Sequence, residues 1–356
     1  MRILVLPGDG IGPEITAAAL EVLALVDRKL ALGLAFETHE IGLAALKAGG
    51  TTLPDAVLDV ARAADAIILG PVSHAEYPGR GEGGINVSAE LRITLDLYAN
   101  IRPSRSRAGL AHYGRTPMDL VIVRENTEGF YADRNMHRGL GEFMPTADLA
   151  LSVRKISAEG SRRIAAAAFD LARGRRRKLT AVHKVNVLKI SEGLFLREVR
   201  KLSEAYPDVV YEEQLVDSMA ALLVRDAERF DVVVTTNMFG DILSDEAAEL
   251  SGSLGLAGSI NAGDAHCMAQ AQHGSAPDIA GQDRANPVSL VLSCAMLLAW
   301  LGRRRGVERL RRGAAAVEQA VDALLSDPAT RTVDVGGKLG TTAFTAALCA
   351  EIGRRL

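Results

Sequence analysis

The chain contains 356 residues, of which 48% are hydrophobic and 24% charged, and its formal net charge is -3. This length exceeds that of one usual hydrophobic core, so we expect one large domain or two closely packed ones. The slightly acidic total argues against a nucleic-acid partner, and no stretch is apolar for long enough to cross a bilayer, which argues against a membrane partner.

Cysteine usage and the N-terminus indicate the compartment. Cys267, Cys294 and Cys349 are odd in number and lack metal-site spacing, so we expect reduced thiols in or near the core. Met1 leads directly into a strand-like segment and not into a basic and apolar leader, which predicts a cytoplasmic protein. The arginine-rich segments 173–178 and 303–312 contain no aromatic residues and are expected to be solvated helix ends and loops.

The first predicted elements are a strand at 2–6, a glycine-rich turn and a helix over 16–30. The turn has glycines at 8, 10 and 12 and a proline at 13, so it differs from the G-x-G-x-x-G pattern of dinucleotide-binding folds. Further strands are expected at 38–42 and 65–69, with helices between them. Strands that alternate with helices predict an α/β protein with a parallel or mixed sheet covered on both faces.

Three arginines follow. Arg92 lies on a helix predicted over 86–100, Arg102 comes just after that helix, and Arg124 ends an apolar strand. Lone arginines are usually surface residues, but one at the end of a buried strand is less easily explained in that way. Because the guanidinium group matches the geometry of a carboxylate, the three could together bind the carboxylates of a substrate.

The middle of the chain is expected to begin with an extended arm at 139–150. An amphipathic helix over 156–173, capped by Ser157, comes next. A strand at 179–183, a helix at 191–204 and a strand at 211–216 follow.

Polar side chains stand where these successive strands end. Lys184 and Asp217 directly follow two of the strands, and Asn237 follows a third at 231–235. A lysine at the end of a buried strand has to be paired or functional. With Arg124, these side chains are expected at the carboxyl edge of the sheet, where open α/β sheets bind ligands.

Two aspartates lie in the segment FDVVVTTNMFGDILSDEAAEL, residues 230–250. Gly240 is expected to break the preceding run, so that a helix begins at Asp241. Asp245 is four residues further on, which places both carboxylates on one face of that helix. Hard oxygen ligands on a rigid element suit Mg²⁺ or Mn²⁺. The alternative is that both acids only complement the helix N-terminus in water.

Seven motifs in order carry a family resemblance: PGDGIGPEI, LDLYANIRP, VRENTEG with Tyr131, HKVN, VDSMA, NMFGDILSD and HGSAPDIAG. Together they resemble the β-decarboxylating dehydrogenases of 2-hydroxy acids, namely isopropylmalate, isocitrate, homoisocitrate and tartrate/D-malate dehydrogenases. The resemblance implies an α/β fold of two domains with a mixed sheet flanked by helices, which is not a standard Rossmann fold. Residues 1–99 and 252–356 would form a large cofactor-binding domain. Residues 100–251 would form a small domain with the dimer interface and an arm at about 134–152.

The resemblance also implies roles for individual residues. Tyr131 and Lys184 would be the acid–base residues, and the family implies a homodimer in which Lys184 and Asp217 reach into the partner's site. Substrate would be bound by Arg92, Arg102, Arg124, Asn86 and Ser88. Mg²⁺ or Mn²⁺ would be held by Asp217, Asp241 and Asp245. The cofactor would contact Asn186, His273, Gly274, Ser275, Ala276, Pro277, Asp278, Ile279 and Asn286.

Asp278 predicts the cofactor. A carboxylate accepts hydrogen bonds from a ribose diol and repels a 2′-phosphate, which favours NAD over NADP. Relatives that use NADP carry a lysine–tyrosine pair where this chain has Asp278 and Ile279. The alternative is an ordinary acidic residue in a loop.

The resemblance implies that the substrate is a 2-hydroxy acid, and the sequence does not determine which one. Isopropylmalate enzymes usually have Glu-Thr-Gly-Leu-Leu where this chain has residues 85–90, and Asn86 and Ser88 are polar. Gln270 stands where the family generally has a glutamate. We expect NAD- and metal-dependent oxidative decarboxylation of a malate-type acid of the isopropylmalate, tartrate or D-malate kind. Isocitrate or homoisocitrate is the alternative.

Two other classes of function compete with this prediction. A non-catalytic regulatory subunit would have lost site residues, whereas the acid–base pair and all three metal-binding aspartates are present. A phosphate- or nucleotide-binding protein that uses only the glycine-rich turn would show no metal-dependent reduction of NAD.

Overall fold

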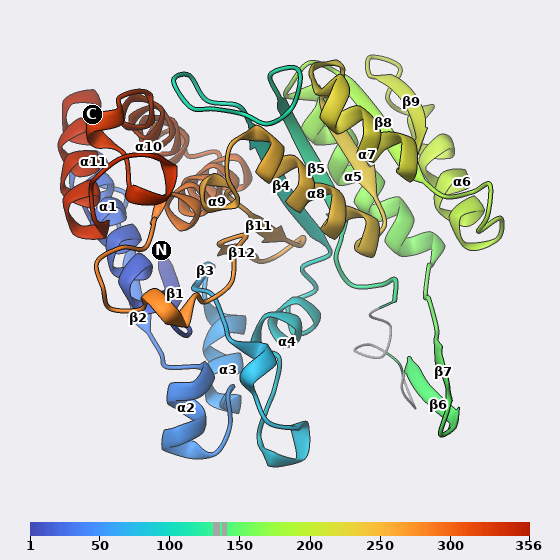
Figure 1. The fold of residues 1–356 in the computed structure, drawn as a ribbon, viewed down its shortest axis with the longest axis horizontal. Helices are drawn as coiled ribbons and strands as arrows, with labels where there is room; N and C mark the ends of the chain where they lie inside the picture. The colour runs from blue at the N-terminus through green and yellow to red at the C-terminus, as the bar shows by residue number, and fades with distance from the viewer. Residues whose placement is uncertain (131–135, 137–140) are drawn as a thin grey trace.

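The computed structural model describes residues 1–130, 136 and 141–356, and its centre is one ten-stranded mixed sheet (Figure 1). Three adjacent pairs are antiparallel, β12 with β11, β11 with β4 and β4 with β5, and the other pairs are parallel. The predicted mixed sheet is thereby confirmed. In spatial order the strands are β2 (Ala35–Thr38), β1 (Arg2–Leu6), β3 (Ala66–Leu69), β12 (Cys267–Gln270), β11 (Ile260–Ala262), β4 (Ala99–Arg105), β5 (Asp119–Glu125), β10 (Val232–Thr235), β8 (Lys178–His183) and β9 (Val210–Leu215).

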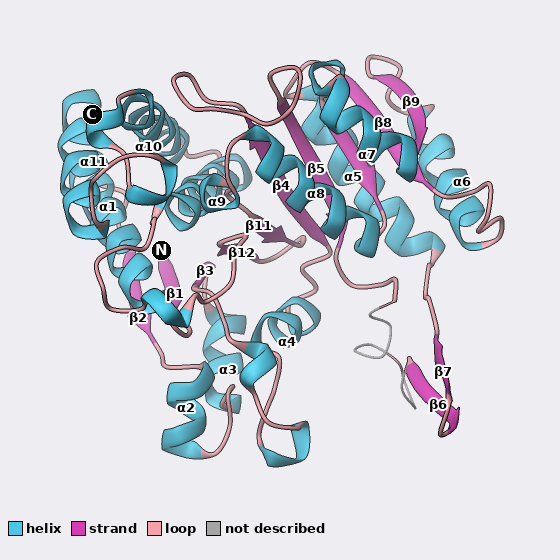
Figure 2. Ribbon diagram, viewed as in Figure 1, coloured by secondary structure: helices cyan, strands magenta, loops and turns pink. Residues whose placement is uncertain are grey.

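Helices cover both faces of the sheet (Figure 2). None of the described helices is long and apolar enough to cross a membrane. The α-helices are α1 (Gly12–Leu30), α2 (Gly42–Gly49), α3 (Asp55–Ala63), α4 (Val87–Thr94), α5 (Ala158–Arg173), α6 (Ser191–Ser203), α7 (Val216–Arg225), α8 (Asn237–Ser251), α9 (Val288–Arg305), α10 (Glu308–Ser326) and α11 (Thr341–Arg355).

Alternate residues of β5 enter two different apolar clusters. Val121 and Val123 pack with Phe169 of α5, whereas Ile122 packs with Leu243 of α8. This is the two-residue period of a strand that is buried on both faces. The β5 half of the sheet is therefore fixed between α5 on one face and α8 on the other, and α8 carries the two aspartates.

The largest apolar cluster joins the two ends of the chain, for example Val22 of α1 with Leu298 of α9 and Val321 of α10. A separate cluster lies wholly within residues 99–234. This distribution suits a division into 1–99 with 252–356 and 100–251. The sheet nevertheless runs through both parts, so the division stays a prediction.

Most predicted elements are confirmed to within a few residues, but three boundaries were wrong. The strand expected at 38–42 lies earlier, at β2, because Gly42 has φ +70° and packs against the Asp9 carboxylate as α2 begins. The helix expected over 86–100 ends at Thr94, after which Asp96 adopts φ +50° and the chain enters β4.

The third wrong boundary is the start of α8, which begins at Asn237 and not at Asp241. Gly240 lies inside the helix. A Cβ atom at this position would stand 2.6 Å from the Cβ of Arg124, so glycine lets α8 approach β5 closely. Asp241 is therefore in the second turn, and the explanation of both acids as helix-start residues loses its geometric basis.

The arm forms a hairpin of β6 (Glu142–Thr146) and β7 (Leu149–Ser152) that projects from the body (Figure 1). Phe143 and Met144 are 46% and 61% exposed. The prediction of an extended arm is confirmed over 141–152, and most of its first part lies outside the described residues. Ser157 caps α5 as predicted, because its side chain accepts a hydrogen bond from the backbone N–H of Gly160 at 3.0 Å.

Candidate active site

A cavity of about 390 Å³, which we call the site cavity, collects many of the predicted site residues. It lies between α4, the middle of the sheet and α8. Its predicted lining residues are Asn86, which caps α4, Ser88 and Arg92 of α4, Arg102 of β4, Arg124 of β5, Asp241 and Asp245 of α8, and His273 and Gly274.

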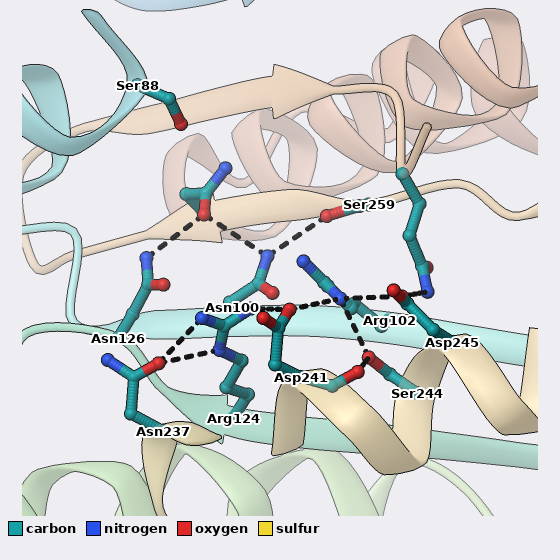
Figure 3. Close-up of polar contacts among 12 residues, drawn as sticks. Ser88, Asn100, Arg102, Arg124, Asn126, Asn237, Asp241, Ser244, Asp245 and Ser259 are labelled. Atoms are coloured by element: carbon teal, nitrogen blue, oxygen red, sulfur yellow. Dashed lines mark hydrogen bonds and ion pairs between the residues drawn. The ribbon is translucent and has the colours of Figure 1, made fainter. Parts of the chain in front are cut away.

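Arg102 lies between the two aspartates, and Arg124 approaches Asp241 from the other side (Figure 3). Arg102 Nη1 lies 3.2 Å from Oδ1 of both Asp241 and Asp245, and 2.7 Å from Ser244 Oγ. Arg124 Nη1 also donates to Asp241 Oδ1. Both arginines are buried, so the aspartates compensate cations that would otherwise be costly to remove from water.

Asn237 fixes the orientation of Arg124. Its Oδ1 accepts hydrogen bonds from Arg124 Nε at 2.9 Å and Nη2 at 2.6 Å. Its Nδ2 in turn donates to the carbonyl oxygen of Glu128 at 2.9 Å. The plane of the Arg124 guanidinium is therefore fixed by hydrogen bonds within the chain.

The Gln270 side chain connects α4 to the sheet. Its Oε1 accepts hydrogen bonds from Ser88 Oγ at 3.1 Å, Arg92 Nη2 at 3.2 Å and Asn261 Nδ2 at 3.3 Å. Asn261 Oδ1 accepts from Asn100 and Asn126 at 3.1 and 3.0 Å, so a buried amide network crosses from β5 to β12. These amides hold the cavity-lining polar groups of α4 in register with the sheet.

Sequence reasoning missed several of these contacts. Gln272 Nε2 donates to Asp245 Oδ1 at 2.9 Å, and Ser244 contacts Arg102. Position could have indicated Ser244, since it lies between the two aspartates on α8. No comparable sequence signal identified Asn261, because its network depends on which strands become neighbours.

Asp241 and Asp245 supply some, but not all, of the oxygen ligands that a divalent cation needs. Both carboxylates face the same side of α8, and the buried Gln272 Oε1 beside them has no hydrogen-bond partner among the described residues. Within that part of the chain, no three acidic, histidine or cysteine side chains gather as a metal site. One chain therefore presents two carboxylates, and a complete shell needs further oxygens.

Lys184 and Asp217 pair with each other and do not line the site cavity. Lys184 Nζ lies 2.6 Å from Asp217 Oδ1, and the two side chains are 25% and 60% exposed. The hydrogen bond from Lys184 lowers the pKa of the Asp217 carboxyl. Asn186, two residues further on, is exposed. Tyr131 lies outside the described residues.

The predicted cofactor segment packs against the N-terminal glycine-rich turn. The Ile11 N–H donates to the Ser275 carbonyl oxygen at 2.8 Å, and a Cβ atom on Gly10 would lie 2.0 Å from that oxygen. The turn thus supports the segment by close backbone contact. It positions the remaining predicted residues Ser275, Ala276, Pro277, Asp278 and Ile279, which lie beyond the site cavity.

His273 offers an unused polar atom where this segment meets the site cavity. Its buried Nε2 has no hydrogen-bond partner among the described residues, and burial lowers the pKa of the ring. Gly274 beside it has open space where a side chain would be. These features fit a ligand that lies along the segment. Asn286, by contrast, is occupied, since its Nδ2 donates to Asp334 at 2.9 Å.

Comparison with known proteins agrees with this geometry. The family model described as isocitrate/isopropylmalate dehydrogenase matches residues 2–353. The isocitrate/homoisocitrate dehydrogenase of Thermus thermophilus is 42% identical over 349 residues, covering 98% of this chain and 97% of the relative. The 3-isopropylmalate dehydrogenase of Saccharolobus solfataricus is 40% identical over 337 residues, covering 94% and 95%.

A solved structure extends the similarity to the fold. The crystal structure of isocitrate dehydrogenase from Methylococcus capsulatus superposes with a TM-score of 0.87 at 38% identity and covers 99% of both chains. The resemblance read from the seven motifs is therefore confirmed. The chain belongs to the isocitrate/isopropylmalate dehydrogenase family and is an enzyme of the decarboxylating dehydrogenase class.

Proposed function

We propose that this protein oxidatively decarboxylates a malate-type 2-hydroxy acid with NAD⁺ and Mg²⁺ or Mn²⁺, giving a 2-keto acid, CO₂ and NADH. The observation that carries the proposal is the set of two buried arginines, Arg102 and Arg124, held against Asp241 and Asp245 in one cavity. This arrangement supports the proposal, because cations that could receive carboxylates lie beside carboxylate oxygens that could ligate a metal, and a chelating hydroxy acid needs both.

The chain's own residues would bind and orient the substrate. Arg102 and Arg124 would receive its carboxylates, with Arg92 approaching from α4. Asp241 and Asp245, with Asp217, would hold the metal, which when bound lowers the pKa of the substrate hydroxyl and stabilises the negative charge left by CO₂ loss. NAD⁺ would accept the hydride.

Proton transfer is assigned to two residues. Lys184 would take the proton of the substrate hydroxyl, directly or through one water, and Tyr131 would give a proton to C3 after CO₂ leaves. Each step thus has a residue of suitable chemistry. Because Lys184 and Asp217 lie outside the site cavity, they would act in the cavity of a second copy of the chain.

Exposed apolar side chains support such a homodimer. The β6–β7 arm exposes Phe143 and Met144, and Ile242, between the two site aspartates, is 59% exposed. Next to Lys184, Val187 and Ile190 are 65% and 89% exposed. A second copy of the chain would bury these apolar side chains, which lie at both halves of the proposed shared site.

The C3 substituent of the substrate is proposed to be small or polar. Gln270 turns its Oε1 towards Ser88, Arg92 and Asn261, and its Nε2 has no hydrogen-bond partner in the described part of the chain. An amide N–H₂ at the cavity wall can donate to a hydroxyl or carboxylate oxygen, which an isopropyl group lacks. The same observation favours isocitrate or homoisocitrate as the second candidate.

NAD is proposed over NADP because Asp278 is exposed on the segment beyond Gly274, where its carboxylate would face a ribose. The regulatory-subunit alternative is disfavoured, since Lys184, Asp217, Asp241 and Asp245 are all retained.

The decisive experiment measures NADH formation with Mn²⁺ and five substrates: D-malate, tartrate, isopropylmalate, isocitrate and homoisocitrate. We expect turnover with at least one, higher with a small or polar C3 group than with isopropylmalate, and none after chelation of the metal. Replacing NAD⁺ by NADP⁺ should lower kcat/KM. Absence of NADH with every substrate would overturn the proposal.

A further inference from the structure

A second cavity, of about 400 Å³, lies between α9, α10 and the end of β4, and we call it the α9–α10 cavity. It shares no lining residue with the site cavity. Short side chains create the hollow, because Ala295 and Ala299 of α9 face Ala314 and Ala315 of α10 across it. Its volume is within the range of small-molecule sites, ~300–1,000 Å³.

Apolar side chains form much of its wall. Leu256 and Leu292 are buried, and Met296 is partly exposed on the same face of α9. The helical spacing of Leu292, Met296 and Ala299 places all three on one side. A ligand for this cavity therefore needs an aliphatic part.

Ser104 supplies an unsatisfied polar group. It lies on β4, lines the cavity and is only 2% exposed, and its Oγ has no hydrogen-bond partner among the described residues. A buried hydroxyl without a partner is unfavourable. An oxygen atom of a ligand would satisfy it.

Arg303 supplies a solvent-exposed cation that no described carboxylate pairs with. The last turn of α9 carries three arginines, of which Arg305 pairs with Asp65 and Arg304 lies 5.4 Å from the centroid of the Trp300 ring. Arg303 lines the cavity, and in residues 1–130, 136 and 141–356 no side chain forms a hydrogen bond or ion pair with it. Partial removal from water lowers its pKa, and the like charge of Arg311 lowers it further.

The other lining arginines are fixed by carboxylates. Arg105 and Arg107 both pair with Asp322, and the Arg107 side chain is 9% exposed. Arg175 pairs with Asp119 at 2.8 Å. Arg311 pairs with Glu308, the first residue of α10. Arg303 is thus the lining arginine without a carboxylate partner among the described residues. The guanidinium of Arg311 lies near it and repels it.

We propose that the α9–α10 cavity binds a small aliphatic carboxylate. Its carboxylate pairs with Arg303 and accepts a hydrogen bond from Ser104, and its aliphatic part lies against Leu256, Leu292 and Met296. Inorganic phosphate shares the charge but has no apolar part to bury, so the walls favour the carboxylate. This site is independent of the proposed reaction.

Calorimetric titration of the whole chain with hexanoate tests the proposal, with hexanamide and inorganic phosphate as matched probes. Hexanoate should bind, and both other probes should bind at least roughly tenfold more weakly. Arg303→Gln should weaken hexanoate binding by roughly tenfold, because the charge-assisted hydrogen bond is lost. Arg304→Gln, the neighbouring arginine that stacks on Trp300, is the control and should bind as the parent does.

A second variant fills the hollow. Ala299→Leu should remove binding, and its thermal unfolding is followed to confirm that it is folded. Equal binding by Arg303→Gln and Arg304→Gln would overturn the proposal and place the carboxylate elsewhere, the site cavity included. Equal binding of hexanoate and hexanamide, or no binding of hexanoate, would also overturn it. The comparison of Arg303→Gln with Arg304→Gln tests the proposed site even if Ala299→Leu does not fold.

Discussion

The site cavity and the α9–α10 cavity are nearly equal in volume but differ in how their charges are compensated. In the site cavity Arg102 and Arg124 contact aspartates that also face the ligand space. In the α9–α10 cavity most arginines are held by carboxylates and one, Arg303, has no such partner among the described residues.

The two cavities also differ in whether one chain supplies all the residues that are proposed to act in them. Residues of one chain line the α9–α10 cavity, whereas under the proposed function the site cavity also needs Lys184 and Asp217 of a second copy. We therefore expect that ligand binding in the α9–α10 cavity needs one chain, whereas turnover in the site cavity needs two.

Asp241→Asn should reduce kcat by about a thousandfold or more, since it removes a proposed metal ligand and a charge that pairs with two buried arginines. It should also destabilise the fold by about 1–3 kcal/mol, because Arg102 and Arg124 lose part of their compensation. Steady-state kinetics and thermal unfolding measure the two effects. Glu246→Gln, on the same helix but outside the site cavity, is the control and should retain activity. Normal turnover by Asp241→Asn would refute its assigned role.

Lys184→Ala should be folded and nearly inactive, because no other group replaces the proposed base. Mixing it with Asp241→Asn tests whether sites are shared. If Lys184 of one copy serves Asp241 of the other, hybrid dimers contain one intact site, and roughly a quarter of parental activity should return. Refolding the two variants together and assaying NADH measures this. No recovery in verified hybrid dimers would show that each site belongs to one chain.

Gln270→Glu should lower kcat/KM by about tenfold for a substrate with a polar or charged C3 group, a change of ~1.4 kcal/mol. The carboxylate would draw Arg92 towards itself and could no longer donate to the substrate. D-malate, which has no C3 substituent, is the internal control and should be affected less. An equal loss for all substrates would assign Gln270 to positioning alone.

The smallest expected effect is on stability in mild acid. Burial lowers the pKa of His273 and of His183 below their usual value of 6.5. Between the lowered pKa values of the folded chain and 6.5, the unfolded chain therefore binds more protons than the folded chain does. The free energy of unfolding should consequently fall as pH decreases from about 6.5 through the folded pKa values. Unfolding midpoints across this range measure the effect, and His273→Gln should reduce the slope. An unchanged slope in that variant would show that His273 does not contribute.

The sequence by itself determined the local structure and the family. Apolar runs located most strands of the main sheet to within a few residues, and Ser157 marked the start of α5, because strand period and helix capping depend on neighbouring residues. A four-residue spacing placed Asp241 and Asp245 on one helix face, where both meet Arg102. The seven motifs together identified the family across the chain.

Only the tertiary structure decided how these residues meet. Gly240 was interpreted as a break, but it lies inside α8 because Arg124 of β5 packs against it. The hydrogen bonds from Ser88 and Arg92 to Gln270 join residues far apart in the chain, and strand order alone brings them together. Lys184 and Asp217 follow the neighbouring strands β8 and β9 and pair with each other outside the cavity that holds Asp241, which the strand order decides. Propensity and spacing act over a few residues, whereas these contacts depend on the packing of distant segments.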